Sequence, residues 1–131
     1  MNETVNLHLP QFEASDRIMR TDFNDAFAAI DEAVPRIVTG SYVGDGAYGR
    51  DNICSLTFDF EPKLIIICGE IETSMLVLMR GCTLPLYHHQ EYHNRMCTVT
   101  WSGGTVSWWS TYSAATQMNG GGWKYHYVAF R

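Results

Sequence analysis

The chain has 131 residues, 46% of them hydrophobic and 18% charged, with a formal net charge of −5. This length allows one domain with at most an appended segment, and the hydrophobic fraction supports a packed core and argues against disorder. The acidic balance argues against nucleic acid as a partner, because a phosphate-binding face needs clustered Lys and Arg and no basic run is present.

The start of the chain, Met1–Thr4, has no Lys or Arg and no apolar run behind it, so no secretory signal is predicted. The longest unbroken apolar run, Leu64–Cys68, is too short to cross a bilayer, and we expect no membrane insertion. The cysteines fall about fourteen residues apart and match no metal-binding knuckle. We expect buried free thiols, with two disulfides as the alternative, at Cys54, Cys68, Cys82 and Cys97.

Residues 1–38 are predicted to form an N-terminal segment with one helix, followed by a second domain over residues 39–131. The helix is predicted over Asp22–Val34, because Thr21 can cap its first turn and Pro35 ends it. Its apolar side chains, at spacings of three and four, are Phe23, Ala26, Phe27, Ile30, Ala33 and Val34. A helix of about a dozen residues is too short to be stable alone, so this stripe should pack on the domain behind it or on copies of itself.

From Thr39 onward the pattern is that of β-structure. Residues 63–68 are predicted to form a central strand buried on both faces, and residues 81–95 a polar connection. The other predicted strands and turns are a glycine-punctuated, hairpin-like stretch over 40–49 and strands over 56–60, 74–80, 96–101, 105–109 and 123–131. The expected fold is mainly β: a short N-terminal helix followed by an antiparallel β-sandwich of about seven strands, or a small barrel.

No motif supports an enzyme, a cofactor or a metal centre. There is no GxSxG elbow, and paired carboxylates would have to come from Asp45, Asp51, Asp59, Glu70 or Glu72, since no acid follows Glu91. The best metal candidate is His88 with His89 and His93, but it has no fixed fourth ligand and its segment does not read as a helix. We therefore expect no catalytic residues, no cofactor and no bound metal.

The last residues, Trp101–Arg131, hold all four Trp and carry only two charges, at Lys124 and Arg131. Rigid aromatic rings among small polar residues are the composition of a recognition surface, although a β-core with glycine-rich turns explains part of them. Rings stack on the C–H faces of sugars while polar groups bind hydroxyls, and the same chemistry suits a protein epitope. Trp101 and Trp108 lie in alternating segments, where core packing is expected.

We predict that the ligand surface is formed by the 87–93 connection together with the 109–119 loop, because both interrupt strands and carry rings with polar tips. The candidate ligand-binding residues are Tyr87, His88, His89, Tyr92, His93, Trp109, Tyr112 and Asn119.

Two regions resemble a known family. Asn6–Ile18 (NLHLPQFEASDRI), running into Thr21–Asp31 (TDFNDAFAAID), resembles the amino-terminal start of tailed-phage and prophage tail-fibre proteins, where this stretch mounts the fibre on the tail. Residues 40–49, 56–67 and 125–130 resemble the distal tip modules of the same proteins and, more faintly, H-type lectin sandwiches, which are trimeric sugar-binding domains. The shaft usual between mount and tip is absent, and Gly81–Gly122 matches no pattern.

This resemblance implies a receptor-binding protein that attaches to a bacterial surface glycan or protein through a tip formed by residues 39–131. The implied partners are phage tail or baseplate proteins, through residues 1–38, and further copies of the chain in a homotrimer. The expected trimer seam consists of Phe23, Ala26, Phe27, Ile30 and Ala33. The implied location is the virion tail, after assembly in the bacterial cytoplasm.

Two alternatives remain open. The first is a structural virion component, such as a collar, head fibre or tail adaptor, whose aromatic residues are buried between subunits. The second is a variable binding protein diversified by a phage retroelement.

Overall fold

The computed structural model describes residues 1–71, 74–82, 86–89 and 97–131. These residues divide into two compact units, Met1–Pro35, which holds the helix, and Arg36–Arg131, which is built of strands and loops. The prediction of a mainly β chain with antiparallel sheets and one helix is confirmed. The described residues form three sheets of two, five and three strands, so the single sandwich of about seven strands is corrected.

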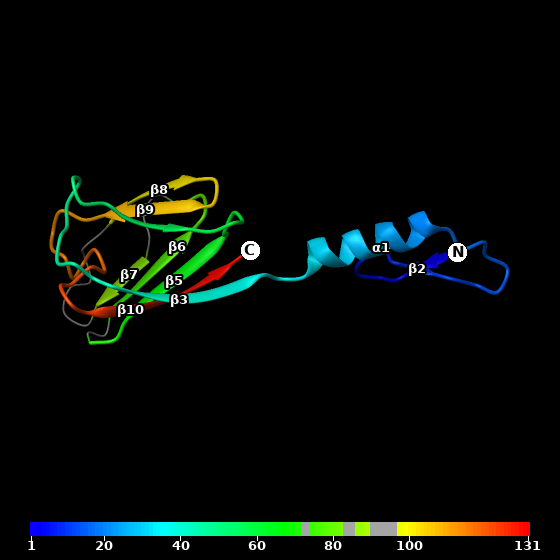
Figure 1. Ribbon diagram of the computed structural model, residues 1–131, viewed down its shortest axis with the longest axis horizontal. Coiled ribbons are helices and arrows are strands. Elements are labelled where there is room, and N and C mark those ends of the chain that lie inside the picture. The colour runs from blue at the N-terminus through cyan, green and yellow to red at the C-terminus, as the bar shows by residue number, and fades with distance from the viewer. Residues whose placement is uncertain (72–73, 83–85, 90–96) are drawn as a thin grey trace. The chain divides into compact units, whose positions relative to one another are not determined.

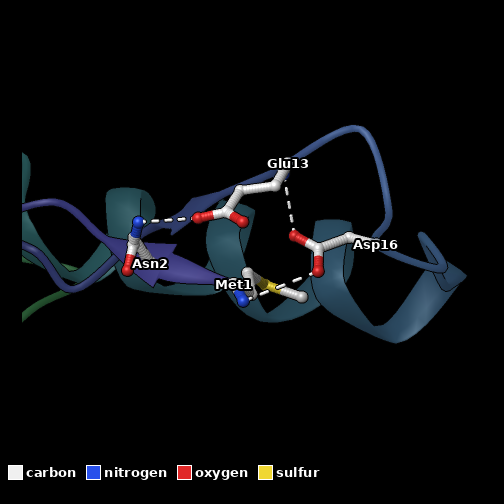
Figure 2. Close-up of polar contacts among 4 residues, drawn as sticks. All are labelled: Met1, Asn2, Glu13 and Asp16. Atoms are coloured by element: carbon white, nitrogen blue, oxygen red, sulfur yellow. Dashed lines mark hydrogen bonds and ion pairs between the residues drawn. The ribbon is translucent and has the colours of Figure 1, made fainter.

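The first unit begins with a small antiparallel sheet of β1 (Asn2–Glu3) and β2 (Pro10–Gln11). Polar contacts tie the start of the chain to the segment that follows β2 (Figure 2). The Asn2 amide donates to Glu13 Oε1 over 2.9 Å, and the Met1 amino group lies 3.5 Å from Asp16 Oδ1. Because this sheet precedes the helix, the helix is not the N-terminal element of the chain.

The helix α1 spans Arg20–Ala33, close to the predicted range. Its N-cap is Met19 rather than Thr21, which lies inside the first turn. The Asp22 carboxylate reaches back and accepts a hydrogen bond from the Met19 backbone N–H over 2.8 Å. The backbone N–H of the N-cap residue is out of reach of a hydroxyl at the N-cap, but a carboxylate three residues later can accept a hydrogen bond from it. Asp22 therefore supplies the side-chain contact at this helix terminus. The helix ends at Val34, its C-cap, immediately before Pro35, as a following proline requires.

The apolar stripe of α1 is largely exposed within the first unit. No residue of the helix is buried, and Phe23 and Phe27 are 44% and 64% exposed. The Phe23 ring lies 5.6 Å from the Phe12 ring, which covers only one end of the stripe. Burial of the stripe between copies of the chain stays a prediction.

The second unit contains a five-stranded sheet in the order β3-β10-β5-β6-β7 and a three-stranded sheet in the order β4-β9-β8 (Figure 1). Every pairing within them is antiparallel. The strands are β3 (Ile37–Val43), β4 (Cys54–Thr57), β5 (Leu64–Gly69), β6 (Ser74–Met79), β7 (Leu86–His89), β8 (Thr98–Ser102), β9 (Thr105–Trp109) and β10 (Lys124–Phe130).

The expected hairpin over residues 40–49 does not form. Residues 37–43 instead make one long strand, β3, whose partner is the last strand of the chain, β10. Gly40 lies opposite Tyr127 in this pairing, and a side chain at position 40 would collide with the Tyr127 ring. Gly40 is therefore needed for the packing of an aromatic neighbour and does not mark a turn.

One apolar core joins the inner faces of the five- and three-stranded sheets. Alternate residues face it, because successive side chains of a strand point to opposite sides of the sheet. The buried apolar residues are Ile65, Ile67, Leu76, Leu78, Tyr125 and Ala129 from the larger sheet, Val99, Val106 and Trp108 from the smaller one, and Cys97 and Met118 beside them. The expected core position of Trp108 is confirmed, and Trp101 packs against the same core.

The prediction that residues 63–68 are buried on both faces is wrong within the described residues. Ile65 and Ile67 face the core, whereas Leu64 and Ile66 on the other side of β5 are only half-buried and Cys68 is exposed. The smaller sheet packs on one face of the larger sheet, and no further sheet in the described residues of this unit covers the opposite face, where Leu64 and Ile66 lie half-buried. The expected burial of all four thiols is also corrected: Cys97 is buried and Cys54 half-buried, while Cys68, on the second face of β5, and Cys82, in the turn after β6, are exposed.

Candidate ligand-binding site

Two long connections between strands lie at the same end of the second unit. Val43, the last residue of β3, pairs with Lys124, the first of β10, and Cys54, the first of β4, pairs with Trp108 near the end of β9. The β3–β4 connection (44–53) and the β9–β10 connection (110–123) therefore lie at the same end, at the left of the β unit in Figure 1. We call it the loop end. β7 also finishes there, since its last residue pairs with the first residue of β6.

The predicted 87–93 connection is partly a strand. Tyr87, His88 and His89 lie on β7, at the edge of the five-stranded sheet, and Tyr92 and His93 lie outside the described residues. Polar residues are tolerated on an edge strand, which explains why a polar composition was misread here as a connection. The described part of the predicted 87–93 segment, residues 87–89, and the predicted 109–119 loop thus both run to the loop end, brought there by the sheet order.

The three candidates of the 109–119 loop have different environments. Trp109, the last residue of β9, is half-buried, and Tyr112 is 52% exposed. Asn119 is only 8% exposed, because residues 116–120 form the buried part of this loop. Tyr112 is therefore the accessible ring of the set, and Asn119 is a polar group held inside the loop end.

A buried glutamine organises the loop end. Gln117 is fully buried, and its side-chain oxygen accepts hydrogen bonds from the backbone N–H groups of Gly49 and Ser110, each over 2.9 Å. Its amide nitrogen donates to the backbone carbonyl of Asn52 over 2.6 Å and contacts Cys54 Sγ. One side chain thus joins the two connections, and a buried amide is tolerated because both of its polar atoms have partners.

The glycine-rich run 119–122 lies backbone to backbone against the start of the β3–β4 connection. The Gly44 N–H donates to the Trp123 carbonyl over 2.8 Å, and the Gly122 N–H donates to the Gly44 carbonyl over 2.9 Å. A side chain at Gly44 would collide with the backbone of Gly120 and Asn119. The glycines are therefore required for this close approach, which aligns the neighbouring residue, Asp45, with Asn119.

Asp45 and Asn119 form a rigid polar pair. The Asn119 side-chain nitrogen donates to Asp45 Oδ1 over 2.6 Å and to the Ala47 carbonyl over 2.8 Å, and its oxygen accepts from the Asp45 backbone N–H over 3.2 Å. Asp45 Oδ1 also accepts from the Ala47 N–H over 2.9 Å. These contacts engage one carboxylate oxygen of Asp45 in the protein and hold the position of the other, Oδ2.

A cavity of about 440 Å³ opens beside this pair, between the edge strands β3 and β4. Its lining includes the half-buried Tyr42 and the core residue Trp108, and Asp45 and Asp51 supply its carboxylates. The described residues of the lining are Tyr42, Asp45, Asp51, Asn52, Ile53, Cys54, Ser55, Leu56, Trp108 and Asn119. None of these residues is a Lys, Arg or His, so the formal charges among them are both negative.

The cavity's titratable groups other than the carboxylates are held protonated. Burial raises the pKa of the Tyr42 phenol far above its usual range, and the phenol donates to the Met118 carbonyl over 2.7 Å. Burial also raises the pKa of the Cys54 thiol, against a lowering by the Gln117 amide. Because a nucleophilic cysteine needs its thiolate, Cys54 is unsuited to covalent chemistry at neutral pH.

Within the described residues, no group of His, Cys, Asp or Glu side chains is arranged to hold a metal ion. The predicted histidine cluster lies partly outside those residues, at His93. Over the same described ranges, no helix is both long and apolar enough to cross a membrane.

Sequence reasoning found Asn119 but missed the other parts of this site. Asp45 and Asp51 were considered only as possible catalytic acids, and Tyr42 and Gln117 were not singled out. The available signal was the pair of glycines flanking Asp45, Gly44 and Gly46, together with the glycine run at 120–122. Neither pattern indicates by itself that the two segments meet.

No protein-family model matches the chain, and no curated protein or solved structure matches it either.

Proposed function

We propose that this chain is a phage tail-fibre-like receptor-binding protein, which attaches to a bacterial surface glycan without catalysing a reaction. The cavity at the loop end is the observation that carries the proposal. Its volume of about 440 Å³ lies in the range of small-molecule sites, and its lining combines fixed oxygen acceptors with the half-buried aromatic residue Tyr42. A sugar unit offers hydroxyls to the acceptors and a C–H face to the Tyr42 ring. A protein receptor would instead need a contact area of about 800 Å² on each partner, spread over the surface around the cavity.

Tyr112 extends the same end of the molecule toward solvent. Its ring is 52% exposed and lies on the connection that also carries Asn119. Tyrosine is frequent at the centres of binding surfaces, because it adds a large rigid contact area and a polar tip at low entropic cost. On this proposal the cavity takes one sugar unit, Tyr112 contacts a neighbouring part of the glycan, and the two larger sheets are the layers of a lectin-like sandwich.

The first unit supplies the mount and the oligomer contact in this proposal. Its resemblance to tail-fibre starts covers residues 6–31, and its helix leaves Phe23, Phe27 and Ile30 exposed. A parallel three-helix seam would bury these apolar side chains, which a single amphipathic helix leaves exposed to water. The proposal thus includes a homotrimer on the virion tail, with tail or baseplate proteins as partners of the N-terminal unit.

A second function, a structural virion component, is favoured by the open side of the five-stranded sheet. The cross-strand row Ile37–Phe130–Leu64–Met79 puts four apolar residues next to one another there. Ile37 and Met79 are 58% and 52% exposed. A contiguous exposed apolar patch is typical of a protein interface, so in this alternative the sheet packs against a neighbouring subunit.

Two substitutions at opposite ends of the second unit separate these functions. The purified full-length protein is assayed for binding to intact bacterial cells and to a glycan array, and for its oligomeric state by light scattering. Receptor binding predicts that Tyr112→Ala weakens attachment while Ile37→Ala, a matched loss of exposed apolar area, leaves it unchanged. If Ile37→Ala disrupts assembly and the wild type binds neither cells nor glycans, the structural function is the correct one.

A further inference from the structure

We infer that the cavity between β3 and β4 selects sugar units that are neutral or carry an amine, and rejects units that carry a carboxylate, phosphate or sulfate. This inference rests on the proposed glycan-binding function and adds the chemical class of the ligand. It follows from three features of the lining: the balance of hydrogen-bond donors and acceptors, the charge, and the rigidity of one acceptor.

The donors of Asn119 and Tyr42 are engaged within the protein, while the carboxylates of the lining leave acceptors open. The Asn119 amide donates one N–H to Asp45 Oδ1 and the other to the Ala47 carbonyl. The Tyr42 hydroxyl donates its single proton to the Met118 carbonyl. The described hydrogen bonds of Asp45 all fall on Oδ1, and Asp51 carries a second exposed carboxylate. A ligand that fits such a lining must bring the protons, which sugar hydroxyls and ammonium groups do.

The charge of the lining acts against an acidic ligand. Among the described residues of the lining, Asp45 and Asp51 are the two ionisable carboxylates and none is cationic. Arg50 precedes Asp51 in the chain but is not a lining residue. An anionic group in the cavity would be desolvated and repelled by the two carboxylates, with no opposite charge to compensate. A neutral diol would instead donate hydrogen bonds to the same oxygens.

The rigidity of Asp45 makes the selection geometric as well as electrostatic. Its Oδ1 is fixed by two N–H donors, and its backbone is held between Gly44 and Gly46, which bond to Trp123 and Asn119. Oδ2 therefore occupies a set position before any ligand arrives. An acceptor that is already in place binds a hydroxyl without a further ordering cost, which is the advantage of a preorganised site.

The experiment measures calorimetric binding of three matched probes, N-acetylglucosamine, glucosamine and glucuronic acid, to the full-length protein. Neutral and amine-bearing probes are expected to bind at millimolar concentration, with glucuronic acid weaker by roughly tenfold or more. Asp45→Asn keeps an oxygen at the Oδ1 position and replaces Oδ2 with a donor, so it should weaken the neutral probe and reduce the discrimination against glucuronic acid. Asp51→Asn tests the charge alone at a carboxylate that is not part of the Asn119 pair. Asp59→Asn, which removes the same charge from the opposite end of the unit, is the control.

The outcomes distinguish the inference from the function on which it rests. Equal binding of glucuronic acid and the neutral probe, or unchanged discrimination in both Asp45→Asn and Asp51→Asn, would overturn the inferred selectivity while leaving attachment to cells intact. Attachment to cells with no binding of any probe would also overturn it, because the cavity would then not be the sugar site. Absence of binding to cells, glycans and probes alike would instead count against the proposed function.

Discussion

Replacement of Gln117 by Leu is expected to destabilise the second unit by about 3 kcal/mol. The substitution keeps the volume of the side chain but removes its four polar contacts. Two backbone N–H groups, of Gly49 and Ser110, then lose their acceptor, and a buried donor without a partner costs about 1–3 kcal/mol. Ser110 is 1% exposed and bears the full penalty, whereas Gly49 is half-buried and can recover part of it from water.

The loss is measured by urea unfolding followed by tryptophan fluorescence, since Trp108 lies in the core and donates to the Gln117 backbone carbonyl. For a unit of this size, about 3 kcal/mol corresponds to a fall in Tm of roughly 12–24 °C. Gln11→Leu is the matched control, because the same substitution there is at an exposed position of the first unit. A loss below about 0.5 kcal/mol for Gln117→Leu, the usual range of a surface substitution, would refute the role assigned to this residue.

Three further outcomes are expected. Phe27→Asp should convert the assembly into monomers in light scattering, because an unpaired charge would enter the apolar seam; a wild-type monomer at micromolar concentration would contradict the seam itself. Trp108→Ala should lower the free energy of unfolding by about 3–5 kcal/mol, whereas Tyr112→Ala should leave stability nearly unchanged and weaken cell binding by about 1–3 kcal/mol; a large stability loss for Tyr112→Ala would assign its ring to the core. Cys68 should be alkylated by iodoacetamide much faster than Cys97, because Cys68 is exposed while burial raises the pKa of the Cys97 thiol to about 12. The thiolate of Cys97 becomes abundant only as pH rises toward that value, so equal labelling of both cysteines near pH 7, read by mass spectrometry, would count against the buried position of Cys97.

Local sequence patterns determined the elements of this protein well. The alternation of residues 105–109 and 123–131 predicted β9 and β10, because a period of two is the direct signature of a strand with one buried face. Pro35 set the end of the helix within one residue, since proline restricts the residue before it. Trp108 was placed in the core on the same local basis.

The tertiary structure decided which elements meet. β3 pairs with β10 across more than eighty residues, as the register of Gly40 with Tyr127 shows, and no local pattern carries that choice. The same pairing brings Asp45 to Asn119 and so creates the polar pair beside the cavity. An amino-acid pattern indicates which faces of a strand are apolar, but only the packing of the sheets decides whether the second face is covered. Within the described residues, the second face of β5 is only half-buried. The cavity is lined by residues that are distant in sequence. The sequence therefore showed its carboxylates but could not show where the cavity lies.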